Sequence, residues 1–230
     1  MIPYFSTALS LILVTVVAFA IGNFLYEKSG KFPLLQPVLI ATSIVAVFIK
    51  ITDLPYDMYF QTTKPLHDLL GPTIVALSVP LYANLAKARS LIFPIFATIF
   101  VGGCVVTLSA IFLGWCFGLA EPMNLALATK SVTAPIAVLI AEKIGTGGPL
   151  IIFTVFLTGI FGVIVIPNLL RVCGITDRAV IGLTLGLTSH TFGIARSADF
   201  GSESMAFATL GMSLMGCACA VLIPVLFRLL

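Results

Sequence analysis

The stretch PMNLALATKSVTAPIAVLIA, residues 122–141, is mostly apolar, and Lys130 is its only charged residue. An ammonium group at membrane depth is costly unless it faces protein, water or an anion. The residues that follow, Ser131-Val132-Thr133-Ala134-Pro135, add two hydroxyl groups and end in a proline. Because proline removes a backbone donor and disfavours helical geometry in the residue before it, we expect a helix break here. A single cation beside hydroxyl groups and broken backbone predicts an anion site.

The composition of the whole chain is that of a membrane protein. Of its 230 residues, 60% are hydrophobic and 9% are charged, and the mean hydropathy is +1.18. An ordinary soluble domain has about 25% charged residues. Cut at its charges and its Gly/Pro clusters, the sequence gives eight apolar segments, most of them long enough for a helix across a hydrocarbon core of about 30 Å. They are residues 2–26, 33–49, 66–86, 91–119, 122–141, 149–170, 179–195 and 204–230. We therefore predict an all-α polytopic membrane protein with about seven to eight transmembrane segments, some broken or re-entrant, in one transmembrane domain over residues 1–230.

Several classes of function are not expected. The twelve basic residues are scattered and form no run of the kind that binds nucleic acid or anionic lipid. The five cysteines suit small residues at helix contacts better than a disulfide or metal site, and the two histidines are far apart in sequence, so we expect no metal and no other cofactor. The chain has no phosphate loop, and no nucleophile with a base and an orienting acid is evident, so an enzyme is not expected.

Two further segments should not form unbroken helices. In the third segment Gly71-Pro72 is followed by Pro80, and a simple proline kink is the alternative to a break. In the seventh segment Thr188-Ser189-His190-Thr191 precedes Gly193 and Arg196, the densest polar cluster in any apolar segment. In a helix that begins at Ala179, His190 would lie about 16 Å from the helix start, near the middle of a membrane.

The charged and titratable residues of these segments allow more than one role. His190 could be a neutral hydrogen-bonding residue, a proton carrier or, least favoured, a metal ligand. Arg196 and Asp199 are spaced i, i+3 and could simply pair with each other. Arg196 could instead be the substrate cation, with Lys130 holding the broken helix in place. Lys130 has no acidic neighbour in sequence, which favours an anionic ligand, although Asp68 or Asp199 could approach it in the fold.

Internal similarity and charge placement bear on the topology. Pro80 and Pro94 recur as Pro135 and Pro149 at an offset of 55, and the pattern Gly159 to Arg171 resembles Gly216 to Arg228 at an offset of 57. These spacings indicate either an internal repeat, parallel or inverted, or a coincidence.

Cytoplasmic loops are rich in Lys and Arg. With the N-terminus outside, a re-entrant segment 122–141 puts seven basic residues inside and four outside. If all eight segments cross, the split is six against five, so re-entry is favoured. Separately, Gly182-x-x-x-Gly186 predicts close helix packing.

Four stretches taken together resemble the LrgB family, which includes LrgB-, CidB- and YohK-like bacterial membrane proteins and the C-terminal half of the plastid glycolate/glycerate translocator. They are Phe32–Pro37 (FPLLQP), Leu70–Tyr82 (LGPTIVALSVPLY), Lys130–Ala137 (KSVTAPIA) and Ser189–Arg196 (SHTFGIAR), in the family's order. The sequence departs from the family at Ala134, where a second threonine is common, and at Thr191, where glycine or alanine is common. The resemblance implies a multi-pass protein of the bacterial inner membrane.

The resemblance implies two kinds of function. The first is a secondary transporter of small monocarboxylates such as glycolate, glycerate, pyruvate or lactate. The second is an antiholin-like or holin-like regulator of murein hydrolase activity and lysis, acting with a small LrgA- or CidA-like membrane protein. The embedded cation and hydroxyls favour transport, since a lytic pore needs no such site. Assembly with further copies of the chain is left open.

The transport hypothesis assigns a role to each candidate residue. Lys130 or Arg196 attracts the carboxylate, the hydroxyl groups of Ser131, Thr133 and Ser189 bind oxygen atoms, and His190 carries a coupled proton. The remaining substrate-site candidates shape the breaks that we expect to converge on one cavity: Pro135, Gly193, Gly71 and Pro72.

Overall fold

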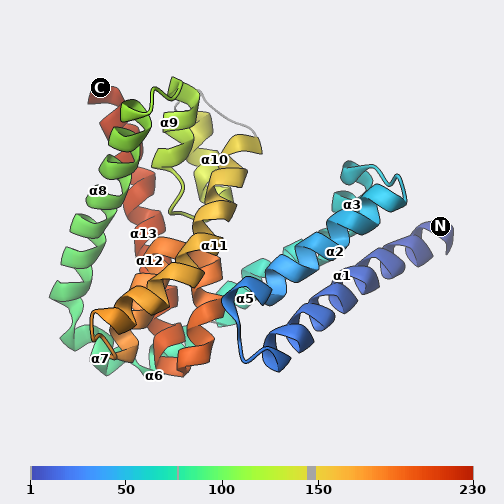
Figure 1. The fold of residues 1–230 in the computed structure, drawn as a ribbon, viewed down its shortest axis with the longest axis horizontal. Coiled ribbons are helices and arrows are strands. Elements are labelled where there is room, and N and C mark those ends of the chain that lie inside the picture. Colours follow the sequence, from blue (N-terminus) through green and yellow to red (C-terminus); the bar gives the residue numbers. More distant parts are fainter. Residues whose placement is uncertain (1, 77, 144–148, 230) are drawn as a thin grey trace. The chain divides into compact units, whose positions relative to one another are not determined.

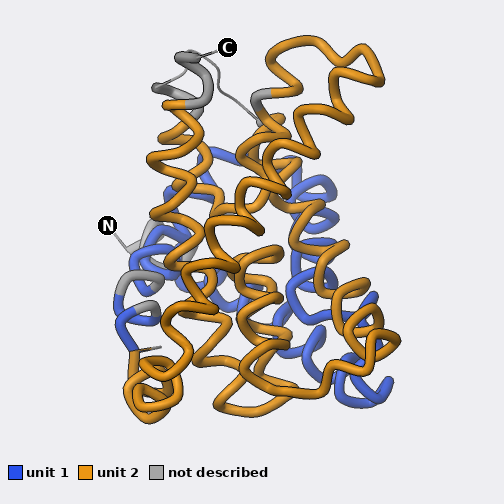
Figure 2. Tube along the Cα trace, turned by 90° about the vertical axis from the view of Figure 1, so that its left-hand side faces the viewer, with its two compact units in different colours: residues 1–76 blue, residues 77–230 orange. Residues whose placement is uncertain are grey.

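The computed structural model describes residues 2–76, 78–143 and 149–229, and every regular element in these ranges is a helix (Figure 1). The chain divides into two compact units, Met1–Ala76 and Leu77–Leu230 (Figure 2). All-helical architecture is what an apolar chain must adopt in lipid, because a helix satisfies its backbone hydrogen bonds within one segment. The predicted all-α class is therefore confirmed.

The first unit is built on one long helix and a shorter partner. Gly22 of the long helix lies against the backbone of Pro37, the first residue of the partner, where a Cβ atom would be only 2.6 Å from the carbonyl oxygen. Thr15 Oγ1 and Tyr59 OH are 2.7 Å apart and fix a third helix to the first. The elements are α1 (Ile2–Lys28), η1 (Pro33–Leu35), α2 (Pro37–Ile51), α3 (Tyr56–Thr62), α4 (Lys64–Asp68) and α5 (Leu70–Ala76).

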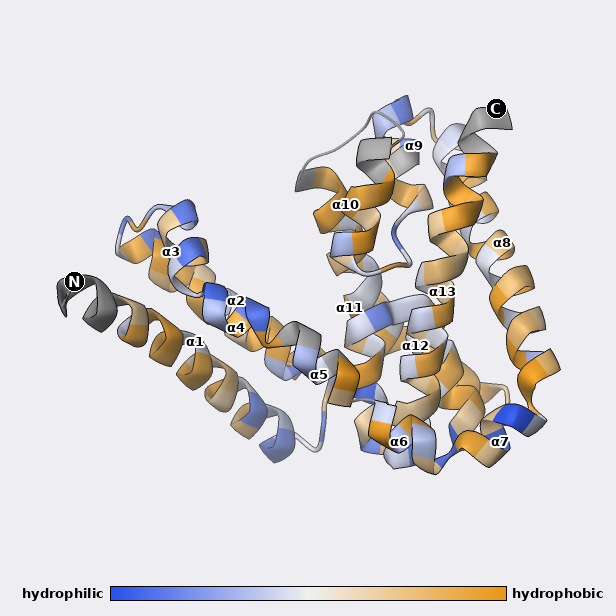
Figure 3. Ribbon diagram, turned by 180° about the vertical axis from the view of Figure 1, so that it is seen from behind, coloured by the Kyte–Doolittle hydropathy of each residue, from blue (hydrophilic) through white to orange (hydrophobic). Residues whose placement is uncertain are grey.

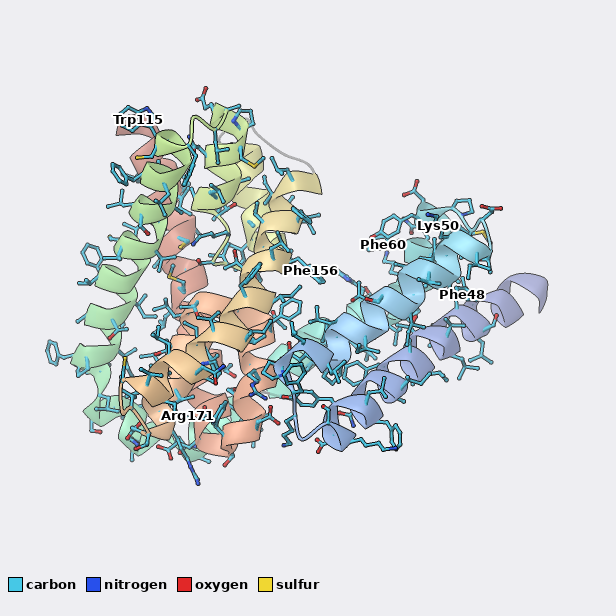
Figure 4. All side chains as sticks on the ribbon, in the orientation of Figure 1. Phe48, Lys50, Phe60, Trp115, Phe156 and Arg171 are labelled. Atoms are coloured by element: carbon cyan, nitrogen blue, oxygen red, sulfur yellow. The ribbon has the colours of Figure 1, made fainter. Side chains whose placement is uncertain are left out.

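The second unit holds three long helices and several short ones. Its elements are α6 (Ser78–Ala83), α7 (Leu85–Ser90), α8 (Ile92–Cys116), α9 (Glu121–Ala128), α10 (Ala134–Lys143), α11 (Pro149–Val172), α12 (Arg178–Ser197), η2 (Ala198–Phe200) and α13 (Ser202–Leu229). We call the end of this unit formed by α7, the start of α12 and the start of α13 the basal end. The end where α8 stops and α9 begins is the distal end. Figure 4 shows Arg171 at the basal end and Trp115 at the distal end.

The helix α8 shows why this unit belongs in a bilayer. One stripe of α8 is buried against the other helices: Ile95, Ile99, Gly103, Thr107, Ala110 and Gly114. The opposite face is apolar as well, and Phe93 and Phe100 are 86% and 60% exposed (Figure 3). A helix that is apolar all round is either in a protein core or in lipid. Since no described helix of this unit covers this face, lipid is its natural solvent.

Within the described ranges, four helices are long and apolar enough to cross a membrane by length and composition: Ala8–Lys28, Ile92–Cys116, Leu150–Val172 and Ser202–Val225. The expected count of seven to eight transmembrane segments is not confirmed. In the second apolar segment α2 has only 15 residues. The third segment is divided among α4, α5, α6 and α7, so Gly71-Pro72 and Pro80 do not lie in one continuous helix. The boundary between α5 and α6 falls at Leu77, which lies outside the described residues.

The segment with Lys130 enters and leaves at one end of the unit. The predicted break is present, because α9 ends at Ala128 and α10 begins at Ala134. α9 starts a few residues after α8 has reached the distal end, and α10 stops a few residues before α11 departs from that same end (Figure 1). We call α9, α10 and their connection the distal hairpin. Its tip, Thr129–Thr133, contains Lys130 and points toward the middle of the bundle.

The helix α12 also turns back on itself. His190 has a left-handed backbone, φ 43° and ψ −125°, inside an otherwise helical run. A straight helix would place residues 185 and 193 about 12 Å apart. Here Gly193 packs directly on the carbonyl oxygen of Leu185, and Gly201 lies near the guanidinium of Arg178. α12 is therefore a second hairpin, with limbs 178–189 and 191–197 and its tip at His190. We call it the basal hairpin.

This return corrects the topology expected from charge placement. The expectation treated residues 179–195 as a segment that crosses, with Arg178 and Arg196 on opposite sides. Instead both arginines lie at the basal end, because the chain reverses at His190. Periodicity and hydropathy do not distinguish a short hairpin from a span when the whole segment has about the length of a membrane helix.

Glycines let the basal hairpin pack closely on α13. A Cβ atom at Gly182 would meet the backbone carbonyl of Ser204, and one at Gly186 would meet that of Ala208. The predicted close packing at this Gly-x-x-x-Gly pair is thus confirmed. The two helices run in the same direction, since both contacts join residues 22 positions apart.

Ionic contacts hold the basal end together. Lys87 of α7 donates to Glu203 at 2.6 Å and to Asp177 at 3.2 Å. Asp177 also caps α12, accepting from the amides of Ala179 at 2.8 Å and Val180 at 3.1 Å. The hydrogen bond to Glu203, followed by that to Asp177, raises the pKa of Lys87. The bond from the Val180 amide is the main cause that lowers the pKa of Asp177 below its usual 3.8.

We expect Asp177→Ala to lower the free energy of unfolding by about 1 kcal/mol, the usual contribution of a helix N-cap. Asp177→Asn keeps an oxygen for the cap but removes the charge, so it should lose less than half as much. A carboxyl with a lowered pKa stabilises the fold above its unfolded pKa, and that contribution disappears as the pH falls through the folded pKa. Wild-type thermal stability should therefore fall more steeply below about pH 4 than that of Asp177→Asn. Thermal unfolding in detergent would test this, and equal stability of wild type and Asp177→Ala would contradict it.

Candidate functional site

A cavity of about 480 Å³ lies where the two hairpin tips approach α11. The distal hairpin contributes Lys130 and Ser131, and the basal hairpin contributes Thr188. The other lining residues are Val106, Leu127, Thr154, Leu157, Thr158, Phe161, Gly162, Val165 and Ile166. We expected three breaks to converge on one cavity. The segments with Lys130 and His190 each contribute lining residues to this one, and Gly71-Pro72 belongs to the first unit.

Among the described residues, Lys130 is the only charged one that lines this cavity. Its Nζ donates to the Oγ of Ser131 at 3.2 Å, and the helix break leaves both side chains on the tip instead of in a regular helix. Among the described residues, no carboxylate forms an ion pair with Lys130. A partly buried ammonium without a counter-ion favours the binding of an anion, because the anion restores the electrostatic stabilisation lost on leaving water.

The other polar side chains among the lining residues of the cavity carry hydroxyl groups. Thr154 Oγ1 donates to the carbonyl of Ile151 at 2.9 Å and also contacts that of Ala126 at 3.3 Å, which joins α11 to the end of α9. Thr188 Oγ1 donates to the carbonyl of Thr184 at 2.7 Å and lies 3.2 Å from Ser189 Oγ. Each hydroxyl oxygen keeps a free lone pair, and a reorientation of the O–H would let it donate to a bound anion.

Ser189 and His190 lie behind the cavity wall. Ser189 is fully buried, and its Oγ occupies the space that a Cβ atom at Gly162 would need. His190 is 3% exposed, and its Nε2 lies 3.1 Å from the carbonyl oxygen of Val155. If that nitrogen carries the proton, it donates to the carbonyl. In this arrangement His190 joins the tip of the basal hairpin to α11 and does not line the cavity.

The other predicted residues lie in three places. Thr133 is part of the distal tip but not of the cavity lining, and Pro135 is an exposed residue in the first turn of α10. Gly193 packs within the basal hairpin. Arg196 is paired with Asp199 at 2.8 Å and lies 5.6 Å from the ring centre of Phe200, at the base of that hairpin. Gly71 and Pro72 belong to α5 in the first unit. The roles assigned to these residues stay predictions.

Sequence reasoning missed the contribution of α11. Thr154, Thr158 and Gly162 line the cavity and are spaced i, i+4 and i+8, so they form one stripe along the helix. Two hydroxyls and a glycine at helical spacing in an otherwise apolar span were a readable signal.

The fold and the cavity define an integral membrane protein with two helical hairpins that enter from opposite ends and meet at a mostly apolar cavity, whose described lining includes one lysine and several hydroxyl residues. The chain belongs to the LrgB-like family, whose sequence profile matches residues 15–229. It is 31% identical over 223 residues to the holin-like protein CidB of Staphylococcus aureus (strain Mu50) and 30% identical to the CidB of Staphylococcus epidermidis, in each case covering 96% of both chains. It is 25% identical over 224 residues to the antiholin-like protein LrgB of Bacillus cereus, covering 97% of this chain and 95% of that protein. No solved structure matches the chain.

Proposed function

We propose that this protein binds a small carboxylate in the Lys130 cavity and carries it across the membrane. The observation that supports this most is the combination of one cation and several hydroxyl groups at the tip of a broken segment. Intramembrane charges are expensive to maintain and mark substrate or ion pathways. A carboxylate matches one ammonium and neighbouring O–H donors in charge and in hydrogen bonding.

The arrangement of the hairpins suits transport by alternating access. The distal hairpin reaches the cavity from one end of the unit and the basal hairpin from the other. A movement of either hairpin would open the cavity toward its own end while the opposite hairpin keeps the other end closed. Many secondary transporters bind substrate at such discontinuous helices near the midplane.

An inverted internal repeat would account for this arrangement. In it, α8 corresponds to α11, the distal hairpin to the basal hairpin, and α11 to α13, so that α11 is shared by the two halves. The corresponding long helices run in opposite directions. The offset of 55 relates Pro94 in α8 to Pro149 in α11, and the offset of 57 relates Gly159 in α11 to Gly216 in α13. Both similarities therefore relate elements that the proposed repeat pairs. Pro80 of α6 and Pro135 of α10 share the first offset.

Charge placement in the second unit supports a cytoplasmic basal end in the bacterial inner membrane. Short cytoplasmic loops carry an excess of Lys and Arg. At the basal end lie Lys87, Arg89, Arg171, Arg178 and Arg196, whereas Lys143 and Arg228 belong to the ends of α10 and α13 on the distal side. Counting Arg196 at the basal end, where the chain reversal puts it, strengthens this bias.

The direct test is uptake of labelled glycolate, pyruvate or lactate into liposomes that contain the purified protein. Uptake that saturates with concentration, and that unlabelled carboxylate inhibits, is expected. Liposomes that contain the heat-inactivated protein provide the control for leakage. Uptake that rises linearly with concentration and equals this control for all three compounds would contradict the proposal.

A second candidate function follows from the names of the relatives, which support it better than they support transport. CidB is named holin-like and LrgB antiholin-like. We therefore also consider a regulator of murein hydrolase activity and lysis that acts with a small LrgA- or CidA-like membrane protein. This function predicts co-purification with such a partner and altered autolysis in a deletion strain. This candidate would be favoured over the first if a Lys130→Ala variant restores autolysis as fully as wild type does and the wild-type protein shows no carboxylate uptake.

A further inference from the structure

A second, smaller hollow lies at the basal end on the outside of the helix bundle. It has a volume of about 220 Å³ and lies between α7, α8 and α13, with Leu85, Ala88, Arg89, Ile92, Leu210 and Leu214 among its lining residues. We call it the α7 groove. It shares no lining residue with the Lys130 cavity. Apart from Arg89, every residue that lines it is apolar.

Arg89 is the one cation among the described lining residues of the α7 groove, and no ion pair within the described residues neutralises its charge. Two positions earlier in the same helix, Lys87 is paired with both Glu203 and Asp177. Arg89 has no carboxylate partner among the described residues, and its side chain is exposed. The short helix α7 thus presents one cation that is satisfied within the fold and one that is available to an external anion.

The groove leads from this cation toward the interior of the bilayer. Counted from Ser202 at the basal end, Leu210 and Leu214 lie about 12 and 18 Å along α13, at 1.5 Å per residue. Ile92 begins α8 and lies on the same path. Figure 3 shows hydrophilic colour at α7 directly below the hydrophobic length of α8. A ligand for this groove needs an anionic end at the membrane boundary and an apolar chain that runs inward.

We infer that the α7 groove binds an anionic phospholipid, with its headgroup phosphate at Arg89 and one acyl chain along Ile92, Leu210 and Leu214. Basic pockets between transmembrane helices on the cytoplasmic side are known to hold anionic headgroups. The sequence contains no run of basic residues and therefore predicts no anionic-lipid partner. One unpaired arginine above an apolar groove supplies the same recognition without a run.

Native mass spectrometry of the detergent-purified full chain tests this inference. With equal amounts of phosphatidylglycerol and phosphatidylcholine added, wild type is expected to retain phosphatidylglycerol preferentially. Arg89→Ala should reduce that retention by about fivefold, since one Lys or Arg near a membrane surface contributes about that factor. Arg89→Lys should keep most of it. Arg171→Ala is the matched control, because it removes an exposed arginine from the same end of the unit but outside the groove.

Three results would overturn the inference. They are equal retention of the two lipids by wild type, equal loss of phosphatidylglycerol in Arg89→Ala and Arg171→Ala, and displacement of the lipid by soluble glycerol phosphate. The last compound has the headgroup charge but no acyl chain, so competition by it would show that the apolar groove contributes nothing. The variants should unfold at the same temperature as wild type, because the exposed Arg89 side chain forms no ion pair with any described residue.

Discussion

Lys130→Ala is expected to raise the half-saturating concentration for carboxylate uptake by about 30-fold or more, the loss that follows when a charge-assisted hydrogen bond worth about 2 kcal/mol is removed. No other cation stands among the described residues that line the cavity, so none of these neighbours can replace Lys130. Uptake into proteoliposomes across a range of substrate concentrations measures the effect. Lys130→Arg keeps the charge with a different shape and should recover part of the activity.

The same substitution should not weaken the fold. Lys130 is partly buried without a carboxylate partner, and its removal eliminates a desolvation cost. We therefore expect the unfolding temperature of Lys130→Ala to equal or exceed that of wild type. Arg171→Ala, which removes an exposed basal cation, should change neither uptake nor stability. Unchanged uptake in Lys130→Ala would exclude this lysine as the carboxylate ligand, and loss of uptake together with a lower unfolding temperature would point to a structural role.

Gly186→Ala should strongly lower the stability of the second unit. The added Cβ atom would collide with the backbone carbonyl of Ala208, and backbone cannot rotate away as a side chain can. Overpacking of this kind costs about 3 kcal/mol, which corresponds to an unfolding temperature lowered by roughly 10 °C in a chain of this size. Thermal unfolding in detergent measures the difference.

Gly102→Ala is the matched control for this prediction. It also adds one methyl group to a helix that faces α12, but the nearest atom, Cδ1 of the flexible Leu187 side chain, would be 3.5 Å away. That distance is ordinary van der Waals contact. Its unfolding temperature should stay within a few degrees of wild type, and a loss equal to that of Gly186→Ala would mean that helix–helix approach at Gly186 is not the cause.

Much of this architecture could be read from local sequence signals. The lone Lys130 followed by hydroxyl residues and Pro135 predicted the tip of the distal hairpin, because proline and an embedded cation each act on their immediate surroundings. Gly182 and Gly186 predicted close helix packing for a similar reason, and the structure shows that the partner helix is α13. In both cases a residue type is constrained by what lies within a few ångströms.

Longer-range features could not be derived in the same way. The chain reverses at His190 through a left-handed backbone conformation, and the residue there is neither a glycine nor a proline, so the sequence does not indicate the reversal. The pairing of Arg196 with Asp199 was one of two open alternatives, and the choice depends on where the basal hairpin ends. The threonine stripe of α11 became visible as a cavity wall only when both hairpins were in place.

The reversal of the chain at His190 also changes how reporter fusions should be interpreted. With α12 counted as a crossing, α13 would begin at the distal end and a reporter joined after it would lie on the basal side. With α12 folded back, α13 starts beside Lys87 and carries the reporter to the other face of the membrane. A phosphatase reporter, active only outside the cytoplasm, and a fluorescent reporter, active only inside it, would thus exchange their expected signals.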